Sequence, residues 1–373
     1  MLDDKERETL FMLNSIPGMY YGRLKGMYDY AGSFEDAVKV SEAEYFSAGI
    51  FKKTKEPEMY EVRRGDGAFI SQCRRKYEKM QKSGIRMIDF TEEDMPKRLR
   101  CIPDPPVVLF VYGNFPDDGI PSVSIIGSRQ CSEYGKSVAM FFGRELAAEG
   151  VQVISGMAMG IDSSASAGAL AGGNRSYAVL GSGVDVCYPP SSRNLYNEMR
   201  SGKGGIISEF CPDAAGIGYH FVLRNRLIAG LCDVLLVIEA KTKSGTATTV
   251  QYALNQGKDV FALPGRITDP LGKGCNKLIK DGAFILTGPD DVLQYLGITG
   301  KNAGKTLKEQ RMGGLSATEK NILRCMGPEP MHIEDIAEMS KTDINETLGI
   351  LSMLELHGNI KSVGSAYFVK IYI

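Results

Sequence analysis

The sequence of 373 residues contains no tryptophan, only three histidines, and eight cysteines of which no two form a CxxC pair. Zinc sites in proteins depend on cysteine and histidine ligands at short spacings, so this scarcity argues against a metal centre. Thinly spread cysteines indicate reduced thiols, several of them buried in strands. We therefore expect a cytoplasmic protein that holds no metal ion.

Long hydrophobic runs and an excess of one charge are also missing. No apolar run approaches the roughly 18 residues that a membrane-spanning helix needs. The first ten residues, MLDDKERETL, are acidic and polar, unlike a signal peptide. Lysine and arginine number 44 against 45 aspartates and glutamates, which gives a net charge of -1. This balance excludes a protein that holds nucleic acid by bulk charge, so any anion site must be local.

The length and the changes in composition along the chain predict several domains. Residues 1–100 have a helical pattern with mixed charges, and residues 101–298 are rich in glycine and alternate apolar runs with amphipathic stretches. The segment TGKNAGKTLKEQRMGG, residues 299–314, has the polar and glycine-rich composition of a linker. Residues 315–373 then form a small separate unit.

The central segment has the pattern of a doubly wound α/β domain. Its apolar strand candidates cover residues 107–112, 123–126, 151–155, 177–180, 205–208, 233–240, 259–263 and 283–286. Stretches with helical spacing lie between most of them, for example residues 134–150. Continuous apolar strands that alternate with helices indicate a mostly parallel sheet with both faces covered. We predict an extended Rossmann-like domain.

Glycines, cations and hydroxyls gather where these strands end. In a doubly wound sheet, ligands bind outside the carboxyl ends of the strands, where glycines let backbone N–H groups approach an anion. The convergence of several such loops predicts an anion site, although each loop alone is compatible with ordinary turn chemistry. The candidate residues in these loops are Gly127, Ser128, Arg129, Gly156, Lys241, Lys243, Arg266 and Lys273.

The usual nucleotide fingerprints are absent. No GxGxxG follows the first strand, and GSGVDV (181–186) has only two glycines and follows a later strand. No GxxxxGK[ST] is present either. We therefore expect neither a bound dinucleotide nor ATP hydrolysis, and no cofactor.

The segment YHFVLRNRLIAG, residues 219–230, adds aromatic rings and two arginines. On a helix, Arg224 and Arg226 do not share a face, so one can reach the ligand while the other pairs internally. Tyr219 and Phe221 can stack on bases, or they can belong to the core. Rings beside cations in a cleft suit a single nucleic-acid strand, whose bases are unstacked.

No catalytic constellation is recognisable. The carboxylates near the glycine loops are Asp162, Asp185, Glu209 and Glu239. We interpret Asp162 as a helix cap and Asp185 as a turn residue, whereas Glu209 and Glu239 can pair with Arg129 or Arg226. Because no Ser/His/Asp set or Cys/His pair accompanies them, we expect a binding protein and not an enzyme.

A set of motifs in a fixed order resembles the DNA-processing protein family DprA, also called Smf. The matching stretches are SIIGSRQCSEYG (124–135), VISGMAMGIDSSA (153–165), YAVLGSGVDVCYP (177–189), ISEF (207–210), FVLRNRLIAGL (221–231), VIEAKTKSGTATT (237–249), VFALPGRI (260–267) and GCNKLIKDGA (274–283). Together they span most of the central segment, and several of them are rarely found together elsewhere.

The resemblance implies a function. Members of this family bind single-stranded DNA through the Rossmann-like domain, protect incoming DNA and load the RecA recombinase in natural transformation and recombination. By motif match, Gly127, Ser128 and Arg129 would clasp phosphate, and Phe221, Arg224, Asn225 and Arg226 would line a pocket for the strand. The resemblance also implies homodimerisation through this domain and contact with RecA.

The flanking units resemble the terminal domains of the same family. Residues 13–38 are similar to a helical domain of sterile-alpha-motif or helix-hairpin-helix type. Tyr20 stands where a DNA-gripping hairpin usually has its second glycine, which favours a structural or interaction role. Residues 315–373 are similar to a winged-helix domain, with five Lys or Arg and eight Asp or Glu residues. Phosphate repels this charge, so the unit is expected to meet a protein partner.

An enzymatic alternative stays open at this point. The turn Ser244-Gly245-Thr246 and the fold resemble the superfamily of lysine-decarboxylase-like phosphoribohydrolases, which act on nucleoside monophosphates. That family uses a PGGxGT turn, and here the turn is Lys-Ser-Gly-Thr without the Pro-Gly-Gly. A nucleotide-processing enzyme is therefore the second hypothesis.

Overall fold

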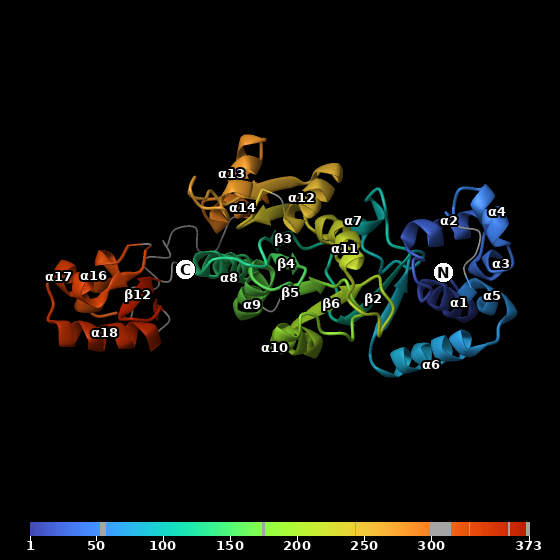
Figure 1. The fold of residues 1–373 in the computed structure, drawn as a ribbon, viewed down its shortest axis with the longest axis horizontal. Helices are drawn as coiled ribbons and strands as arrows, with labels where there is room; N and C mark the ends of the chain where they lie inside the picture. The colour runs from blue at the N-terminus through green and yellow to red at the C-terminus, as the bar shows by residue number, and fades with distance from the viewer. Residues whose placement is uncertain are drawn as a thin grey trace.

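A computed structural model of the chain describes residues 1–52, 57–173, 176–242, 244–298, 315–327, 329–356 and 359–370. Figure 1 shows three parts in chain order along the long axis: an N-terminal helical domain, a domain built on a large sheet, and a small C-terminal unit. The predicted linker, 299–314, and the candidate cation Lys243 lie outside the described residues.

The N-terminal domain is a cluster of short helices. Asp3 caps the first of them by accepting hydrogen bonds from the backbone of Lys5 and Glu6. Ser41 and Glu44 form a capping box at the start of the fourth. The helices are α1 (Asp4–Asn14), α2 (Tyr21–Ala31), α3 (Phe34–Ala37), α4 (Glu42–Ser47), α5 (Pro57–Arg64) and α6 (Ala68–Lys82).

The central domain contains a nine-stranded sheet with the order β1-β2-β6-β5-β4-β3-β7-β8-β9. Strands β3 to β9 run parallel, and β1 and β2 form an antiparallel edge. The strands are β1 (Arg86–Asp89), β2 (Val108–Gly113), β3 (Ser122–Ile126), β4 (Gln152–Ser155), β5 (Ser176–Val179), β6 (Gly204–Ser208), β7 (Val234–Val237), β8 (Asp259–Ala262) and β9 (Phe284–Ile285). All eight predicted strands are present, and the predicted fold class is confirmed.

Helices cover both faces of this sheet. One apolar cluster joins α8 and α9 to one face, and another joins α11 and α12 to the opposite face. Glycine allows α8 and α9 to approach closely, because a Cβ on Gly168 would lie 2.0 Å from the carbonyl oxygen of Met140. The helices of this domain are α7 (Lys97–Arg100), α8 (Glu133–Ala148), α9 (Ile161–Gly173), α10 (Arg193–Glu198), α11 (Gly218–Leu231), α12 (Gly245–Asn255), α13 (Lys273–Lys280) and α14 (Pro289–Tyr295).

The chain order of the strands reverses at β3. From β3 the chain continues through β4, β5 and β6 on one side, and it returns to β7, β8 and β9 on the other. The carboxyl ends of β3 and β7 therefore diverge into loops on opposite sides of the same crevice. This is the position where open α/β sheets bind ligands.

The sheet begins earlier in the chain than the predicted boundary at residue 100. β1 pairs with β2 in register Arg86 with Val111, so residues 86–89 belong to the sheet. This strand is short and flanked by charged residues, and its pattern did not stand out from the helical segment before it.

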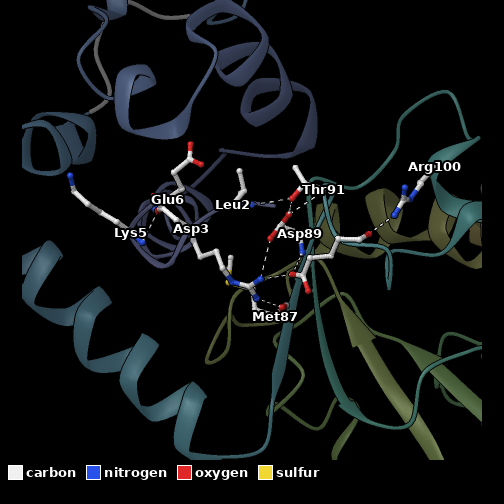
Figure 2. A network of polar contacts seen from close by, with 10 residues as sticks. Leu2, Asp3, Lys5, Glu6, Met87, Asp89, Thr91 and Arg100 are labelled. Atoms are coloured by element: carbon white, nitrogen blue, oxygen red, sulfur yellow. Dashed lines mark hydrogen bonds and ion pairs between the residues drawn. The ribbon is translucent and has the colours of Figure 1, made fainter.

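A polar network fixes the N-terminal helices to this edge of the sheet (Figure 2). Arg7 of α1 donates from Nη1 to Asp89 at 3.2 Å and to Glu92 at 2.5 Å. Asp89 also accepts hydrogen bonds from the backbone and the hydroxyl of Thr91, and the Thr91 hydroxyl accepts one from the backbone N–H of Leu2 at 3.2 Å. Because Asp89 is buried, this network and the apolar cluster shared by the two domains hold them together.

The C-terminal unit has three helices and a small sheet, as predicted for a winged helix. The helices are α16 (Ala317–Cys325), α17 (Ile333–Ser340) and α18 (Ile344–Leu356), and the sheet has the order β10-β12-β11. Its strands are β10 (Met331–His332), β11 (Ile360–Ser362) and β12 (Tyr367–Lys370). Residues 371–373, the end of the unit predicted over residues 315–373, lie outside the described residues.

Among the described residues, no helix is both long and apolar enough to span a bilayer. The same residues contain no cluster of His, Cys, Asp and Glu side chains that could hold a metal ion.

Candidate nucleic-acid interface

A cavity of about 540 Å³ lies at the carboxyl ends of β3 and β7. The turn after β3, the loop after β4, the loop after β7 and the first turns of α11 and α12 form its walls. Of the predicted site residues, the cavity is lined by Gly127, Ser128, Arg129, Phe221, Arg224, Asn225 and Lys241. Residues from four separate segments, 126–130, 158–162, 218–228 and 241–249, thus meet at one rim, whereas the predicted loops after β5 and β8 do not line the cavity.

Arg129 and Phe221 lie side by side in this cavity. The guanidinium carbon of Arg129 lies 5.5 Å from the centre of the Phe221 ring, and the arginine is exposed. Tyr188 lies beside the same ring, with the two ring centres 5.1 Å apart. A cation and aromatic faces at one rim can engage a phosphate and a base at the same time.

Arg224 supports the cavity wall from beneath. It is buried and donates from Nη1 to the carbonyl oxygens of Gly156, at 2.9 Å, and Val179. Burial lowers the pKa of Arg224 to about 10, and the nearby Asp162 opposes this shift. Asp162 is itself buried, which raises its pKa, and its carboxylate accepts a hydrogen bond from the backbone of Gly156 at 3.0 Å. Gly156 is therefore held between the two charged groups and does not itself line the cavity.

We expect Gly156→Ala to disturb this support. A Cβ at residue 156 would lie 2.5 Å from Nη2 of Arg224, which is buried and has little room to move. Overpacking of this kind costs about 1–3 kcal/mol of the free energy of unfolding, to be measured by urea denaturation. Gly245→Ala, where a Cβ meets open space at the same cavity, is the matched control and should change stability by less than about 0.5 kcal/mol. Equal stability of the two variants would contradict the expectation.

Hydroxyl groups of α12 form a wall that the sequence analysis did not assign to DNA binding. Ser244, Thr246, Thr248 and Thr249 line the cavity around the N-terminus of this helix. The hydroxyl of Ser244 is shielded from solvent and has no hydrogen-bond partner. The run of hydroxyl residues directly after Ser-Gly was a signal for a polar wall, because these side chains and the helix N-terminus favour anions.

Two of the predicted cations do not line the cavity. Arg266 is exposed and forms an ion pair with Glu329 of the C-terminal unit. Lys273 opens α13 and is also exposed. Both follow β8, one strand farther from the switch point than β7. Their loop therefore ends beside the crevice and not in it.

Arg226 was predicted to bind DNA, and the structure places it elsewhere. Its side chain is 1% exposed and donates to Glu209 at 2.5 Å. The guanidinium carbon also lies 3.9 Å from the ring centre of Tyr21, which belongs to the N-terminal domain. Arg226 thus forms a buried ion pair within the sheet domain and joins this domain to the N-terminal domain through a cation–π contact. The expectation that one of these two arginines reaches the ligand is met only in part. Arg224 lines the cavity, but its guanidinium is buried and donates to backbone carbonyls, and Arg226 pairs internally with Glu209.

The carboxylates near the site have structural partners. Glu239 accepts hydrogen bonds from the backbone and the hydroxyl of Ser132 at the start of α8, and not from Arg129 or Arg226 as was predicted. Asp185 accepts a hydrogen bond from the backbone of Asp213 at 2.8 Å. Among the described residues that line the cavity, Asp162 is the one acidic side chain, and it is engaged with Gly156. Of the lining residues that the structure describes, none is therefore an acidic side chain with free access to the cavity.

Comparison with known proteins identifies the family of this chain. The sequence family described as DNA recombination-mediator protein A matches residues 86–297, which are more than half of the chain, and the DprA winged helix domain matches residues 308–364. The chain is 41% identical to the DNA processing protein DprA of Streptococcus pneumoniae over 203 residues, which cover 53% of this chain and 70% of the relative. It is 32% identical to protein Smf of Escherichia coli over 77% of this chain and 78% of the relative.

Solved structures of the same kind of protein have the same fold. The X-ray structure of DprA from Streptococcus pneumoniae matches with a TM-score of 0.64 and 29% identity, covering 79% of this chain and 98% of the other. A structure of DNA processing protein A from Helicobacter pylori, whose subject is the binding mode of single-stranded DNA, matches with a TM-score of 0.50 and 28% identity, covering 57% and 95%. The family match, the relatives and the shared fold together make this chain a member of the DprA/Smf family of DNA-processing proteins.

Proposed function

We propose that this protein binds single-stranded DNA in the switch-point cavity, protects incoming DNA there, and passes it to the RecA recombinase in natural transformation and recombination. The observation that carries the proposal is the exposed guanidinium of Arg129 above the Phe221 ring, 5.5 Å from its centre. One phosphate and one adjacent base can engage this pair together. The relative from Helicobacter pylori, which is described as binding single-stranded DNA, supports it.

A single strand suits the site better than a duplex. Phe221 is half-buried inside a cavity of about 540 Å³, so only a base that is free of its stack can reach the ring. Duplex DNA would present phosphates to Arg129 and Lys241 but no base to Phe221. The site therefore discriminates by stacking as well as by charge.

Binding without chemistry is the role that we assign. Asp162 is held by Gly156, and the relative from Streptococcus pneumoniae is named a DNA processing protein. Reduced thiols fit a cytoplasmic location, and all eight cysteines are free in the structure.

The experiment is a titration of fluorescent oligo-dT at several salt concentrations, with blunt duplex as competitor and nucleoside monophosphate turnover assayed in parallel. We expect tight binding of the single strand, weak competition by duplex, and no turnover. Equal affinity for single strand and duplex would contradict the proposal. Release of a free base from the monophosphate would favour the enzymatic alternative.

The composition of the C-terminal unit favours a protein partner over a nucleic acid. Helix α18, with the sequence INETLGILSMLEL, contains no lysine or arginine, whereas Leu348 and Met353 are exposed on it. A helix without cations lacks the positive charge that dominates affinity for the phosphates of a duplex. We propose that this unit meets a protein during the transfer of DNA to RecA.

We further propose that the sheet domain forms a homodimer through the edge at β9. Phe284 and Ile285 make up this strand, and both are exposed, Ile285 to 53%. The Phe284 ring packs on Phe261 with the ring centres 4.9 Å apart and lies beside Tyr295. An exposed apolar strand at the end of a sheet is a template for pairing with another chain, and a second copy would cover it.

Ile285→Glu is expected to convert the dimer to a monomer at micromolar concentration, because a carboxylate would be buried without a partner. Size-exclusion chromatography with light scattering measures the change. Met353→Glu, at an exposed apolar residue of the C-terminal unit, is the control and should leave the dimer intact. A dimer that persists in Ile285→Glu and dissociates in Met353→Glu would show that the interface lies in the winged helix.

A further inference from the structure

We propose a second base-stacking site, formed by Tyr219 of the sheet domain and Tyr20 of the N-terminal domain. It would receive the nucleotide that follows the one held at Phe221, so it rests on the proposed function. Here "the tyrosine step" denotes these two residues. Residues far apart in the sequence form it, and it extends the DNA path from one domain to the next.

The first turn of α11 separates two cavities. Gly218, Phe221 and Asn225 share one side of the helix and line the cavity described above. His220 and Leu223 lie on the other side and line a second cavity, of about 290 Å³, between the N-terminal domain and the sheet domain. Tyr219 stands between the two sides and is 55% exposed. A strand that leaves Phe221 along this turn meets Tyr219 before any other aromatic ring of the helix.

The ring of Tyr219 is braced from one side and open on the other. Its centre lies 5.4 Å from that of Tyr20, with the planes tilted by 55°. Tyr20 in turn makes edge contacts with Phe210 and His220, at 6.3 and 5.8 Å between ring centres. Phe210 and His220 are stacked at 3.8 Å. The bracing rings fix the orientation of Tyr219, and its exposed face is free to take a base.

The surroundings of the step suit the rest of a nucleotide. The second cavity is lined mostly by apolar side chains, together with Asn14, Ser15, Glu209 and Lys76 of α6. Glu209 is paired with Arg226, whereas Lys76 can meet a phosphate. The sugar would lie against Ile217, which is exposed at the start of α11 and lines the same cavity. A ring, a cation and an apolar surface thus lie together where the two domains meet.

The two domains are held firmly enough to keep such a step in place. Arg226 crosses between them to the Tyr21 ring, directly after Tyr20 in the chain. The Ser15 hydroxyl donates to Sγ of Cys211 at 3.2 Å, which joins the end of α1 to the loop after β6. The network at Asp89 (Figure 2) adds a third connection. A base bound at the step would therefore add to affinity without the cost of ordering a loop.

The absence of tryptophan from the sequence allows a direct test. Tyr219→Trp creates a single indole, and stacking of a base quenches its fluorescence. Tyr30→Trp is the matched control, because Tyr30 is an equally exposed tyrosine at the far end of α2. We expect oligo-dT of about 20 nucleotides to quench the first variant and not the second. Quenching of neither variant under conditions where DNA is bound would overturn the proposal.

A length series with the full chain gives the second measurement. Tyr219→Ala is expected to weaken binding of oligo-dT of about 20 nucleotides roughly 5- to 50-fold, and to leave binding of the shortest oligomer that the wild type holds unchanged. Tyr219→Phe should restore the affinity, and Tyr30→Ala should have no effect. An equal loss at every length would place Tyr219 in the first cavity and remove the separate step.

The two proposals fail in different ways. If the wild type binds no oligo-dT at any length, the proposed function is wrong. If the wild type binds and Tyr219→Ala binds equally well at every length, only the tyrosine step is wrong, and the two tyrosines then serve to close the seam between the domains.

Discussion

Arg129→Ala is expected to lower the affinity for oligo-dT about 10- to 100-fold at low salt, because hydrogen bonds to charged groups contribute about 1.5–3 kcal/mol. Arg129 is exposed at the rim of the cavity, and its guanidinium lies beside the Phe221 ring. It is therefore available to a phosphate, whereas Arg224 at the same site is buried and bonded to backbone.

The dependence on salt identifies the kind of contact that is lost. Each phosphate neutralised on a single strand contributes about 0.7 to the slope of log affinity against log salt concentration, so the slope of the variant should be shallower by about this amount. Fluorescence anisotropy at several salt concentrations measures both quantities. Affinity and slope equal to those of the wild type would remove Arg129 from the interface.

Lys258→Ala is the matched control for this experiment. Lys258 directly precedes β8 and so lies at the amino ends of the strands, the edge of the sheet opposite to the cavity. It changes the net charge by the same amount as Arg129→Ala. A comparable loss of affinity in both variants would mean that binding depends on overall charge and not on the switch-point cavity.

Arg226→Ala is expected to lower the free energy of unfolding by about 3–5 kcal/mol, because it leaves the carboxylate of Glu209 buried without its partner. Both side chains of this pair are largely shielded from solvent, and the guanidinium also covers the Tyr21 ring of the neighbouring domain. Urea denaturation measures the loss. A variant that keeps its stability and loses DNA binding would restore the interpretation of Arg226 as a DNA contact.

The pH dependence of the stability of Arg226→Ala tests whether the loss comes from the unpaired carboxylate of Glu209. Burial raises the pKa of Glu209, and Arg226 opposes this shift. Without Arg226 the pKa rises further above the unfolded value of about 4.3, so the folded state binds more protons than the unfolded state. Stability of Arg226→Ala should therefore fall as the pH rises from about 4.3 through the raised pKa of Glu209.

Neutral replacements separate charge from packing. The double variant Glu209→Gln with Arg226→Ala carries no buried charge at this place, so the fall in stability with rising pH should disappear. Replacement of the pair by Glu209→Leu and Arg226→Met should recover much of the stability, because apolar residues of similar volume tolerate burial. A pH dependence that persists in these variants would assign it to another group.

Most of the fold was predictable from local patterns. Apolar runs such as residues 123–126 and 259–263 are strands because a parallel sheet buries both of its faces. β1 was missed, since its four residues owe their place to pairing with β2 and not to a pattern of their own. Of the predicted site, the turn at residues 127–129 and the loop at Lys241 line the cavity, because residues directly after strands β3 and β7 must lie at the switch point.

The tertiary structure was needed to show in which direction the site side chains point and which of them lie close together. The sequence predicted that Arg224 and Arg226 point to different sides of one helix. It did not show which of them faces the cavity, because a carboxylate lies on each side of the helix, Asp162 on one and Glu209 on the other. It placed Arg266 and Lys273 at a strand end, whereas the strand order puts that end beside the crevice. Neither local sequence indicates that the rings of Tyr20 and Tyr219 lie together.

The amino-acid sequence by itself determined the class of sheet, the loops that carry the cations, and the family, because these depend on residue type and on spacing along the chain. Only the tertiary structure decided which arginine is accessible, which carboxylates are already engaged, and which rings lie together. The reason is that burial and pairing depend on segments far apart in the chain, and helix α11 receives its neighbours from both the N-terminal domain and the loops of the sheet.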